Sequence, residues 1–410
     1  MGSRAGAGRR VPLLSLAAVG LVVLFLPGSV LGAEWSDPKR VSSQRGARLD
    51  SLHQLASGGG KLHLLHPRIG PNKTDDRVVY QRSSSSGAGW SKERTLFSSS
   101  TRFRKVVPNM AIAANRSIVV VAWRVLGPND ATLFVRTSRD GGDTFGPRRN
   151  IFSTKRSIGI GVPAVAVGDG VIAVAWTNRG NGRIKVRTSR DAGRSFRKAR
   201  TVGRTRLSID CKRRVTDGLV GLAAAKRRIH LAWSYAPKRS CQASRIKMRT
   251  SADRGKTWNR QRTITNRRSY GWPELDARGS TVVATVQSPS GGLIVARSGQ
   301  NGRNWSDRII KPRQGYSLSA GDIVLLPRKK AMITYVVERI RRAKLLRTRV
   351  VSRMSRNDGV KYRAAKRVTT SSKRLRMAPN IAAARSRLVI LFQRGPLDAS
   401  RRNLFTTRLQ

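Results

Sequence analysis

The sequence predicts an all-β chain that folds as a β-propeller, a ring of four-stranded sheets called blades. Three observations predict this fold. A turn motif of serine, acid, glycine and aromatic residue recurs along the chain, strand-like runs flank each copy, and the unit repeats about every 50 residues. Four short antiparallel strands in a unit of this length are typical of one blade.

The N-terminal segment has the features of an export signal. Three arginines precede the apolar run Val11–Leu26, and small residues follow near Gly32 and Ala33. The run is shorter than the roughly 20 residues that span a bilayer. We therefore predict a signal peptide over residues 1–32 and a propeller over 33–410, with a retained anchor as the alternative. No later segment is apolar enough to cross a membrane, so we expect a secreted protein, extracellular or associated with the cell surface.

The outermost strand of each predicted unit opens with an aromatic residue. Seven such strands occur, and their first residues are Trp35, Trp90, Phe145, Phe196, Trp258, Trp305 and Tyr362. Counting them gives seven blades, with six or eight as the alternatives. The last unit, Pro379–Leu409, supplies only three strands. We expect the strand after Trp35 to supply the fourth, because this pairing closes the ring and covers two exposed edges.

The turn motif has four clear copies, which read SRDGGDTF, SRDAGRSF, SADRGKTW and SGQNGRNW, and the last copy lacks the acid. The acid can accept hydrogen bonds from turn N–H groups, the glycine can adopt positive φ, and the aromatic residue can be buried between sheets. We expect a structural role for these positions: Ser138, Asp140, Gly142 and Phe145; Ser189, Asp191, Gly193 and Phe196; Ser251, Asp253, Gly255 and Trp258; Ser298, Gly302 and Trp305.

These turns resemble the Asp-box, or BNR, repeat of the sialidase-like superfamily of β-propellers. Sialidases of that superfamily use a Tyr–Glu pair, an acid/base aspartate and three arginines that bind a carboxylate. The resemblance implies Tyr270, Glu274 and Asp322 as catalytic candidates, with the first two as the pair. The nearest match to the family's Arg-Ile-Pro motif is Arg68-Ile69-Gly70, which has glycine in place of proline, and catalytic sialidases have six blades rather than seven.

The charge balance is extreme, with 83 Lys and Arg against 21 Asp and Glu and a formal net charge of +62. Such a charge attracts polyanions and disfavours self-association, although a GC-rich genome would also favour arginine. Propeller topology places the basic loops that lead into the inner strands on one face. Arginine can donate two hydrogen bonds to carboxylate or phosphate. The anion-binding candidates are Arg213, Arg267, Arg268, Arg313 and Arg376, with Tyr270 and Trp272 as stacking surfaces.

Few other residues carry a chemical signal. Cys211 and Cys241 fall in two loops on the same face of the predicted fourth blade, so we expect a disulfide in an exported chain. Asp217 is a further acid near this mouth of the ring. His63 and His66 are three apart in a strand and point to opposite sides, so we expect no metal site and no cofactor.

Two classes of function compete. The preferred one is a secreted, monomeric, non-catalytic module that binds acidic glycans, cell-wall polyanions or extracellular nucleic acid. The alternative is an exo-acting glycosidase, most simply a sialidase. In the non-catalytic case, we expect the acids near the mouth to pair with the abundant arginines. A protein–protein scaffold with incidental charge is a third possibility.

Overall fold

The computed structural model describes residues 34–45, 54–68, 76–99, 105–106, 110–156, 159–210, 215–216, 219–236, 245–342, 344–370, 372, 375–385, 387–395 and 401–409. The chain divides into two compact units, Met1–Glu34 and Trp35–Gln410. The predicted export signal lies outside the described residues. In the described part of the chain, no helix has the length and apolar character to cross a membrane.

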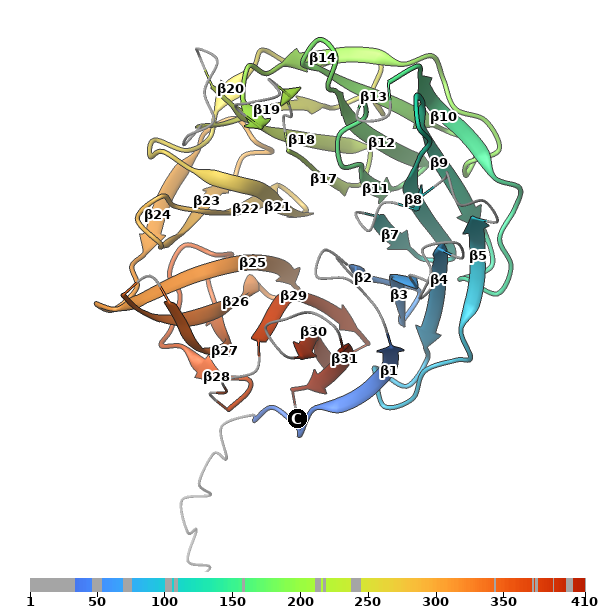
Figure 1. The fold of residues 1–410 in the computed structure, drawn as a ribbon. Coiled ribbons are helices and arrows are strands. Elements are labelled where there is room, and N and C mark those ends of the chain that lie inside the picture. Colours follow the sequence, from blue (N-terminus) through green and yellow to red (C-terminus); the bar gives the residue numbers. More distant parts are fainter. Residues whose placement is uncertain are drawn as a thin grey trace, which may run out of the picture. The chain divides into compact units, whose positions relative to one another are not determined.

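The second unit consists of seven small antiparallel sheets arranged as a seven-bladed β-propeller, shown in Figure 1. Blade 1 contains β2 (Gln54–Gly58), β3 (Lys61–Arg68), β4 (Asp76–Ser83) and β5 (Arg94–Ser99). Blade 2 contains β7 (Ala111–Asn115), β8 (Ile118–Leu126), β9 (Ala131–Ser138) and β10 (Arg149–Thr154), and the short β6 (Lys105–Val106) also pairs with β8. Blade 3 contains β11 (Ala164–Gly168), β12 (Val171–Asn178), β13 (Arg183–Ser189) and β14 (Arg200–Arg204).

The remaining blades follow the same order from the centre to the rim. Blade 4 contains β17 (Val220–Ala225), β18 (Arg228–Tyr235), β19 (Arg245–Ser251) and β20 (Arg262–Thr263), and is preceded by a hairpin of β15 (Ser208–Asp210) and β16 (Val215–Thr216). Blade 5 contains β21 (Tyr270–Arg278), β22 (Thr281–Gln287), β23 (Leu293–Ser298) and β24 (Ser306–Ile310). Blade 6 contains β25 (Tyr316–Leu326), β26 (Lys330–Arg341), β27 (Lys344–Ser355) and β28 (Lys366–Arg367).

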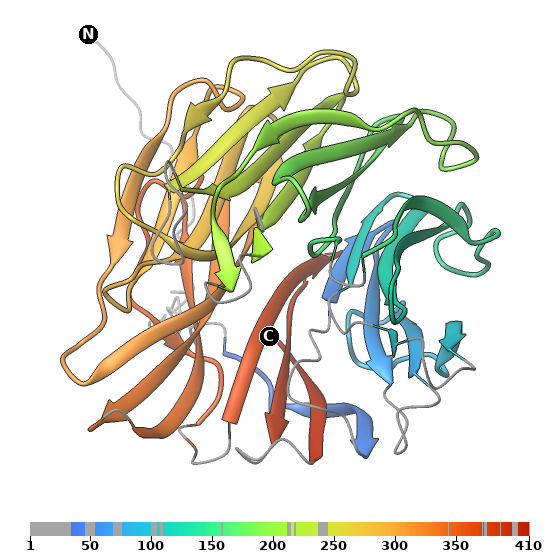
Figure 2. The same ribbon diagram turned by 45° about the horizontal axis from the view of Figure 1, so that its top comes forward.

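The two ends of the unit close the ring in blade 7, as the sequence predicts. This blade contains β29 (Leu375–Ala384), β30 (Arg387–Gly395), β31 (Arg401–Arg408) and, as its fourth strand, β1 (Lys39–Arg45). β1 pairs antiparallel with β31, and Trp35 bridges to Leu409 (Figure 2). The backbone N–H of Ser36 donates to the carbonyl of Arg408 at 2.8 Å. Both the number of blades and the closure are therefore confirmed.

The hydrophobic core is distributed among the interfaces between neighbouring blades. Alternating side chains of each sheet pack against the next sheet, which is the arrangement that period-two strands allow. Trp123, Trp176 and Trp233 are fully buried at the same place in the second strands of blades 2, 3 and 4. The aromatic residues expected to open the outer strands lie before them, as Phe196 does four residues before β14 and Trp258 four residues before β20. They pack against these clusters and are partly buried.

The turn motif has one hydrogen-bonding scheme. The serine hydroxyl accepts from the N–H of the glycine four residues later, at 2.8 Å for Ser138 and Gly142 and 2.7 Å for Ser251 and Gly255. The same bond is present in the two turns with weaker sequence matches, at 2.9 Å in the turn from Ser83 and 3.0 Å in the turn from Ser355. Each of these glycines has positive φ, which suits glycine. The serine and the glycine thus define the turn even where the acid is missing.

Candidate functional site

A ring of equivalent positions lies four residues before the end of each inner strand. In blades 2, 3 and 4 these positions hold small apolar residues, and in the other four blades they hold acids or amides. The seven residues, from blade 1 to blade 7, are Gln54, Ala111, Ala164, Gly221, Glu274, Asp322 and Asn380. One half of the ring therefore carries a polar arc, and two of its members are carboxylic acids.

In three of these blades, the polar residue lies directly after an irregularity in the pairing of the inner strand. The pairing of β21 with β22 shifts between Tyr270 and Glu274, and that of β25 with β26 shifts between Ser319 and Asp322. A similar shift in β29 ends at Asn380. Such irregularities re-aim the side chains beside them. Each shift lies at the beginning of an inner strand, so the polar side chains stand near the mouth of the ring.

Two aspartates of this region bind backbone N–H groups of the next blade. One oxygen of Asp322 accepts from the N–H of Ile323 at 2.7 Å, and the other accepts from Ile381 in blade 7 at 2.8 Å. Asp276 lies two residues after Glu274 and accepts from Leu325 in blade 6 at 2.6 Å. Charge-assisted hydrogen bonds of this kind stabilise the ionised form. The two carboxylates thus join three consecutive blades and are fixed in orientation.

Glu274 differs from both aspartates. Its carboxyl group has no hydrogen-bond partner and no ion pair among the described residues, although it is only partly exposed. Burial raises the pKa of Glu274 to about 8, and the nearby Asp322 carboxylate raises it further. Burial also raises the pKa of Asp322 and of Asp276 to about 6, opposed by the backbone hydrogen bonds. Burial and the charge of Asp322 therefore favour the protonated form of Glu274, whereas the backbone hydrogen bonds favour the ionised form of the two aspartates.

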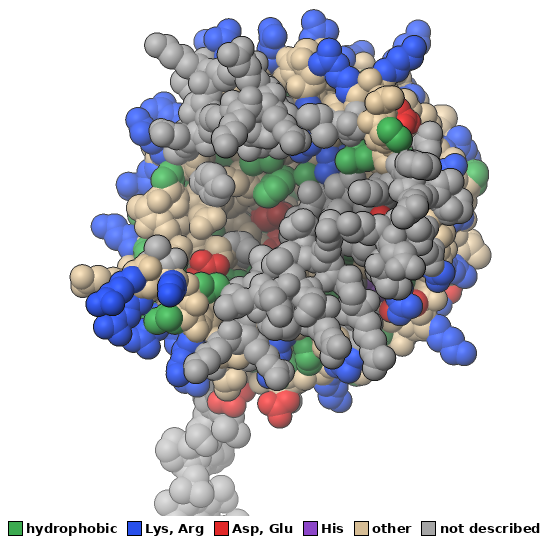
Figure 3. Space-filling model, in the orientation of Figure 1, with side chains coloured by type: hydrophobic (Ala, Val, Ile, Leu, Met, Phe, Trp, Pro, Cys, Tyr) green, Lys and Arg blue, Asp and Glu red, His purple; other side chains and the backbone are tan. Residues whose placement is uncertain are grey.

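The surroundings of the acids contain an exposed aromatic residue and no paired cation. Trp272 lies in the irregular segment before Glu274, with 38% of its surface exposed. Figure 3 shows acidic side chains at the bottom of the hollow in the middle of the ring, with Lys and Arg mainly at the periphery. None of Glu274, Asp276 and Asp322 forms a salt bridge with a described arginine or lysine. Among the described residues, the expected pairing with arginine is not seen for Glu274 or Asp322, and Asp322 accepts from backbone N–H groups instead. Asp217 lies outside the described residues.

The predicted anion-binding residues are only partly placed. Arg213, Cys211, Cys241 and Asp217 lie outside the described residues, so the predicted disulfide stays a prediction. Tyr270 and Arg376 lie at the starts of β21 and β29, where their backbones pair with Gln287 and Arg394.

The other three arginines lie in loops. Arg267 and Arg268 are exposed just before β21, and Arg313 is exposed just before β25. The Nε of Arg267 lies 3.9 Å from an oxygen of Asp307. The structure therefore places these arginines at the ends of blades 5 and 6, and not in contact with the three acids.

Sequence reasoning missed Asp276, Asn380 and Gln54. Gln54 and Asn380 lie four residues before the ends of their inner strands, and Asp276 lies two residues before the end of β21. These positions can be recognised only when the strand ends are known. The three carboxyl groups do not form a metal site, since no group of metal-ligating side chains suited to an ion occurs among the described residues.

The sequence matches no protein-family model and no curated protein. Among solved structures, the chain is similar to the phage phi92 endosialidase, with 9% identity and a TM-score of 0.53 over 92% of this chain and 69% of that chain. It is also similar to the NanB sialidase from Streptococcus pneumoniae, with 11% identity and a TM-score of 0.49 over 92% and 70% of the two chains. A third similar structure is the alpha-L-arabinofuranosidase Arb93A from Fusarium graminearum, with 11% identity and a TM-score of 0.49 over 78% and 98%. The likeness to the endosialidase shows that the two chains share the β-propeller fold.

Proposed function

We propose that this protein is an exported β-propeller of the sialidase-like superfamily that hydrolyses a glycosidic bond at the mouth of its ring. The observation that carries the proposal is the pair of carboxyl groups on adjacent inner strands. Glu274 has no hydrogen bond to a described residue and burial raises its pKa, whereas two backbone N–H groups donate to Asp322 and favour its ionised form. Environments that drive two carboxyl groups into different protonation states are typical of acid and base roles.

The proposed reaction assigns one step to each carboxyl group. Glu274 donates its proton to the glycosidic oxygen as the bond to the anomeric carbon breaks. In an inverting reaction, Asp322 takes a proton from the attacking water, which supplies the new hydroxyl group. In a retaining reaction, Asp322 forms a glycosyl ester, and the ionised Glu274 takes the proton from the water that hydrolyses this ester and releases the Asp322 carboxylate. Asp276 remains a positioning residue, because both of its oxygens accept backbone hydrogen bonds.

The charge of the site suggests the class of sugar. Asp276 and Asp322, which pair with no described arginine or lysine, repel a carboxylate, which a sialic acid would place in the site. A neutral sugar meets no such repulsion, and its ring can stack on the exposed face of Trp272. We therefore propose a neutral glycosyl residue as the group that is cleaved.

The test is a pH–rate profile on nitrophenyl glycosides of several neutral sugars and of sialic acid. We expect a bell-shaped kcat/KM for a neutral glycoside, with limbs near pH 6 and pH 8 that belong to the coupled pair. Glu274→Gln and Asp322→Asn should each lower kcat about 100-fold or more. A dinitrophenyl glycoside, whose leaving group needs no proton, should restore turnover to Glu274→Gln alone.

The control is Arg303→Gln, which changes an exposed residue in a turn of blade 5 and should leave kcat within about twofold. Absence of turnover of every glycoside by the folded wild type would overturn the proposal. So would full activity in Glu274→Gln.

A binding module without catalysis is the second candidate, and the exposed arginines before β21 and β25 favour it. Arg267, Arg268 and Arg313 are free of hydrogen-bonded carboxylates among the described residues, so they can bind anionic groups of acidic glycans, wall polymers or extracellular nucleic acid. A monomer that works outside the cell fits this role, since high net charge opposes self-association.

For this candidate, the binding of a fluorescent acidic oligosaccharide should weaken steeply between 50 and 200 mM salt. The double variant Arg267→Glu/Arg268→Glu should lower the affinity about tenfold at low salt. Binding that does not respond to salt or to these charge reversals would contradict an anion site at the mouth.

A further inference from the structure

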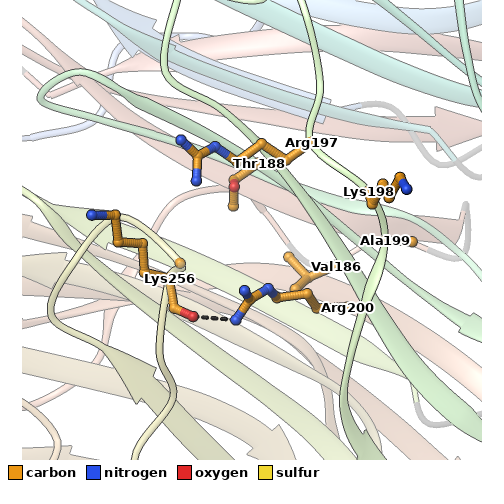
Figure 4. Close-up of a pocket in the computed structure, with 8 residues that line it drawn as sticks. Val186, Thr188, Arg197, Lys198, Ala199, Arg200 and Lys256 are labelled. Atoms are coloured by element: carbon orange, nitrogen blue, oxygen red, sulfur yellow. Dashed lines mark hydrogen bonds between the residues drawn. The ribbon is translucent and has the colours of Figure 1, made fainter.

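Two cavities occupy equivalent places at the rim of the ring. The first, of about 240 Å³, lies between the outer strand segment of blade 3 around Arg197–Arg200 and the turn Gly255–Lys256 of blade 4 (Figure 4). The second, of about 370 Å³, lies between the segment Ser306–Lys311 of blade 5 and the turn Gly359–Tyr362 of blade 6. We call them the first and second rim grooves. Their recurrence follows from the repeat, since each is formed by one outer strand and the next blade's turn.

Both grooves are lined by cations and by no acidic residue. The first contains Arg197, Lys198, Arg200 and Lys256, and the second contains Arg297, Arg308, Lys311, Arg353 and Lys361. None of these residues forms an ion pair with a described carboxylate. Cations gathered in a concave surface focus the field on an anionic ligand.

The first groove presents its charged groups in a fixed arrangement. A guanidinium nitrogen of Arg200 donates to the carbonyl oxygen of Lys256, which fixes the turn against the outer strand (Figure 4). The side chains of Arg197 and Lys256 extend in the same direction in Figure 4, and Thr188 lines the same cavity. Two cations and a hydroxyl donor suit a sulfate or carboxylate group.

The corresponding place between blades 1 and 2 already contains an anion from the chain itself. Asp143 occupies the turn position that Lys256 has in blade 4, and Arg94 donates to its carbonyl oxygen as Arg200 does to that of Lys256. The carboxylate of Asp143 pairs with Arg82 and lies 3.6 Å from Nζ of Lys61. An anionic group is therefore compatible with this inter-blade position.

We propose that the two rim grooves bind the anionic groups of an acidic polysaccharide, so that one long chain can occupy both. The grooves contain hydroxyl groups, the first has no aromatic lining residue, and the second has only the half-buried Tyr362. This scarcity of stacking surfaces favours a glycan over single-stranded nucleic acid. Two linked weak sites raise the affinity for a long chain far above that for a short one. This inference does not depend on the acids of the mouth.

The experiment measures the binding of dextran sulfate and polygalacturonate, each as short and long chains, and of a single-stranded oligonucleotide. The first variant, Arg197→Glu/Lys256→Asp, copies the charge found at Asp143. The second is Arg308→Glu/Lys361→Glu. We expect each variant to weaken long-chain binding of an acidic polysaccharide about tenfold, and the combined variant to lose the advantage of long over short chains.

The matched control, Lys92→Glu/Arg387→Glu, makes the same charge change on exposed residues away from both grooves and should weaken binding less than threefold. Turnover of small glycosides should not change in any of these variants, which separates this inference from the hydrolytic proposal. Equal weakening in the control would show that diffuse charge suffices and would overturn the grooves as sites. Tighter and groove-dependent binding of the oligonucleotide would overturn the choice of a glycan.

Discussion

At the scale of single residues, the decisive feature is a carboxyl group without a partner in a chain rich in arginine. Glu274 is surrounded by acids that are themselves satisfied by backbone N–H groups. Because no cation of the described residues pairs with it, desolvation and the Asp322 carboxylate act together and raise its pKa. Ionisation of such a group lowers the stability of the folded protein, so the raised pKa can be tested by measuring stability at different pH values.

The pKa of Glu274 is about 8 in the folded chain, against an ordinary value of 4.5. Between these values the unfolded state ionises first, so stability falls as the pH rises and levels off above about 8. Glu274→Gln cannot titrate and should avoid this fall. We expect its free energy of unfolding, relative to the wild type, to increase by about 1–3 kcal/mol from pH 5 to pH 8.5 in urea titrations, a range discounted for partial exposure.

The exposed variant Arg268→Gln should follow the wild type at both pH values. If the difference in unfolding free energy between Glu274→Gln and the wild type is the same at pH 5 and pH 8.5, Glu274 is ionised in the folded protein over this range. That result would also remove its role as a proton donor.

At the scale of elements, the turn motif is a hydrogen-bonded unit that repeats independently of its acid. The serine accepts from a buried glycine N–H in six turns, and the acid adds bonds where it is present. Hydrogen bonds from Ser189 and Ser195 hold the pKa of Asp191 well below its usual range. The serine therefore fixes the turn, and the aspartate strengthens it.

Ser251→Ala should destabilise the protein by about 1–3 kcal/mol, because the buried N–H of Gly255 loses its acceptor. Urea unfolding measures this loss. Ser280→Ala, in an exposed turn of blade 5, is the matched control and should cost less than about 0.5 kcal/mol. Equal effects of the two substitutions would show that the turn does not depend on the serine hydroxyl.

At the scale of the whole ring, much of the fold was predictable and much of the site was not. Repeat spacing predicted seven blades, and the missing fourth strand of the last unit predicted the pairing of β1 with β31. Loop composition predicted a basic mouth, but the residues that face the centre depend on strand register. The shifts before Glu274, Asp322 and Asn380 follow from backbone pairing, which a local sequence pattern does not determine.

The rim grooves also could not be predicted from the sequence, because their residues come from different repeats. Arg197 and Lys256 belong to different repeats, and they meet only because the turn of one blade lies over the outer strand of the preceding blade. A reading of either repeat alone gives a charged surface and no cavity. Alignment of the turns shows that Lys256 and Asp143 occupy equivalent positions. That this position accommodates an anionic group is shown only by the ion pair of Asp143 with Arg82.

The pairing of Ser36 with Arg408 joins residues that are 372 positions apart. During synthesis, β1 is therefore among the first strands to leave the ribosome, while its partner β31 is among the last. Until then, six blades can form from local hairpins, but the seventh cannot be completed. The strand β1 therefore stays without its partner until β31 has been made, and the pairing of these two strands completes the ring.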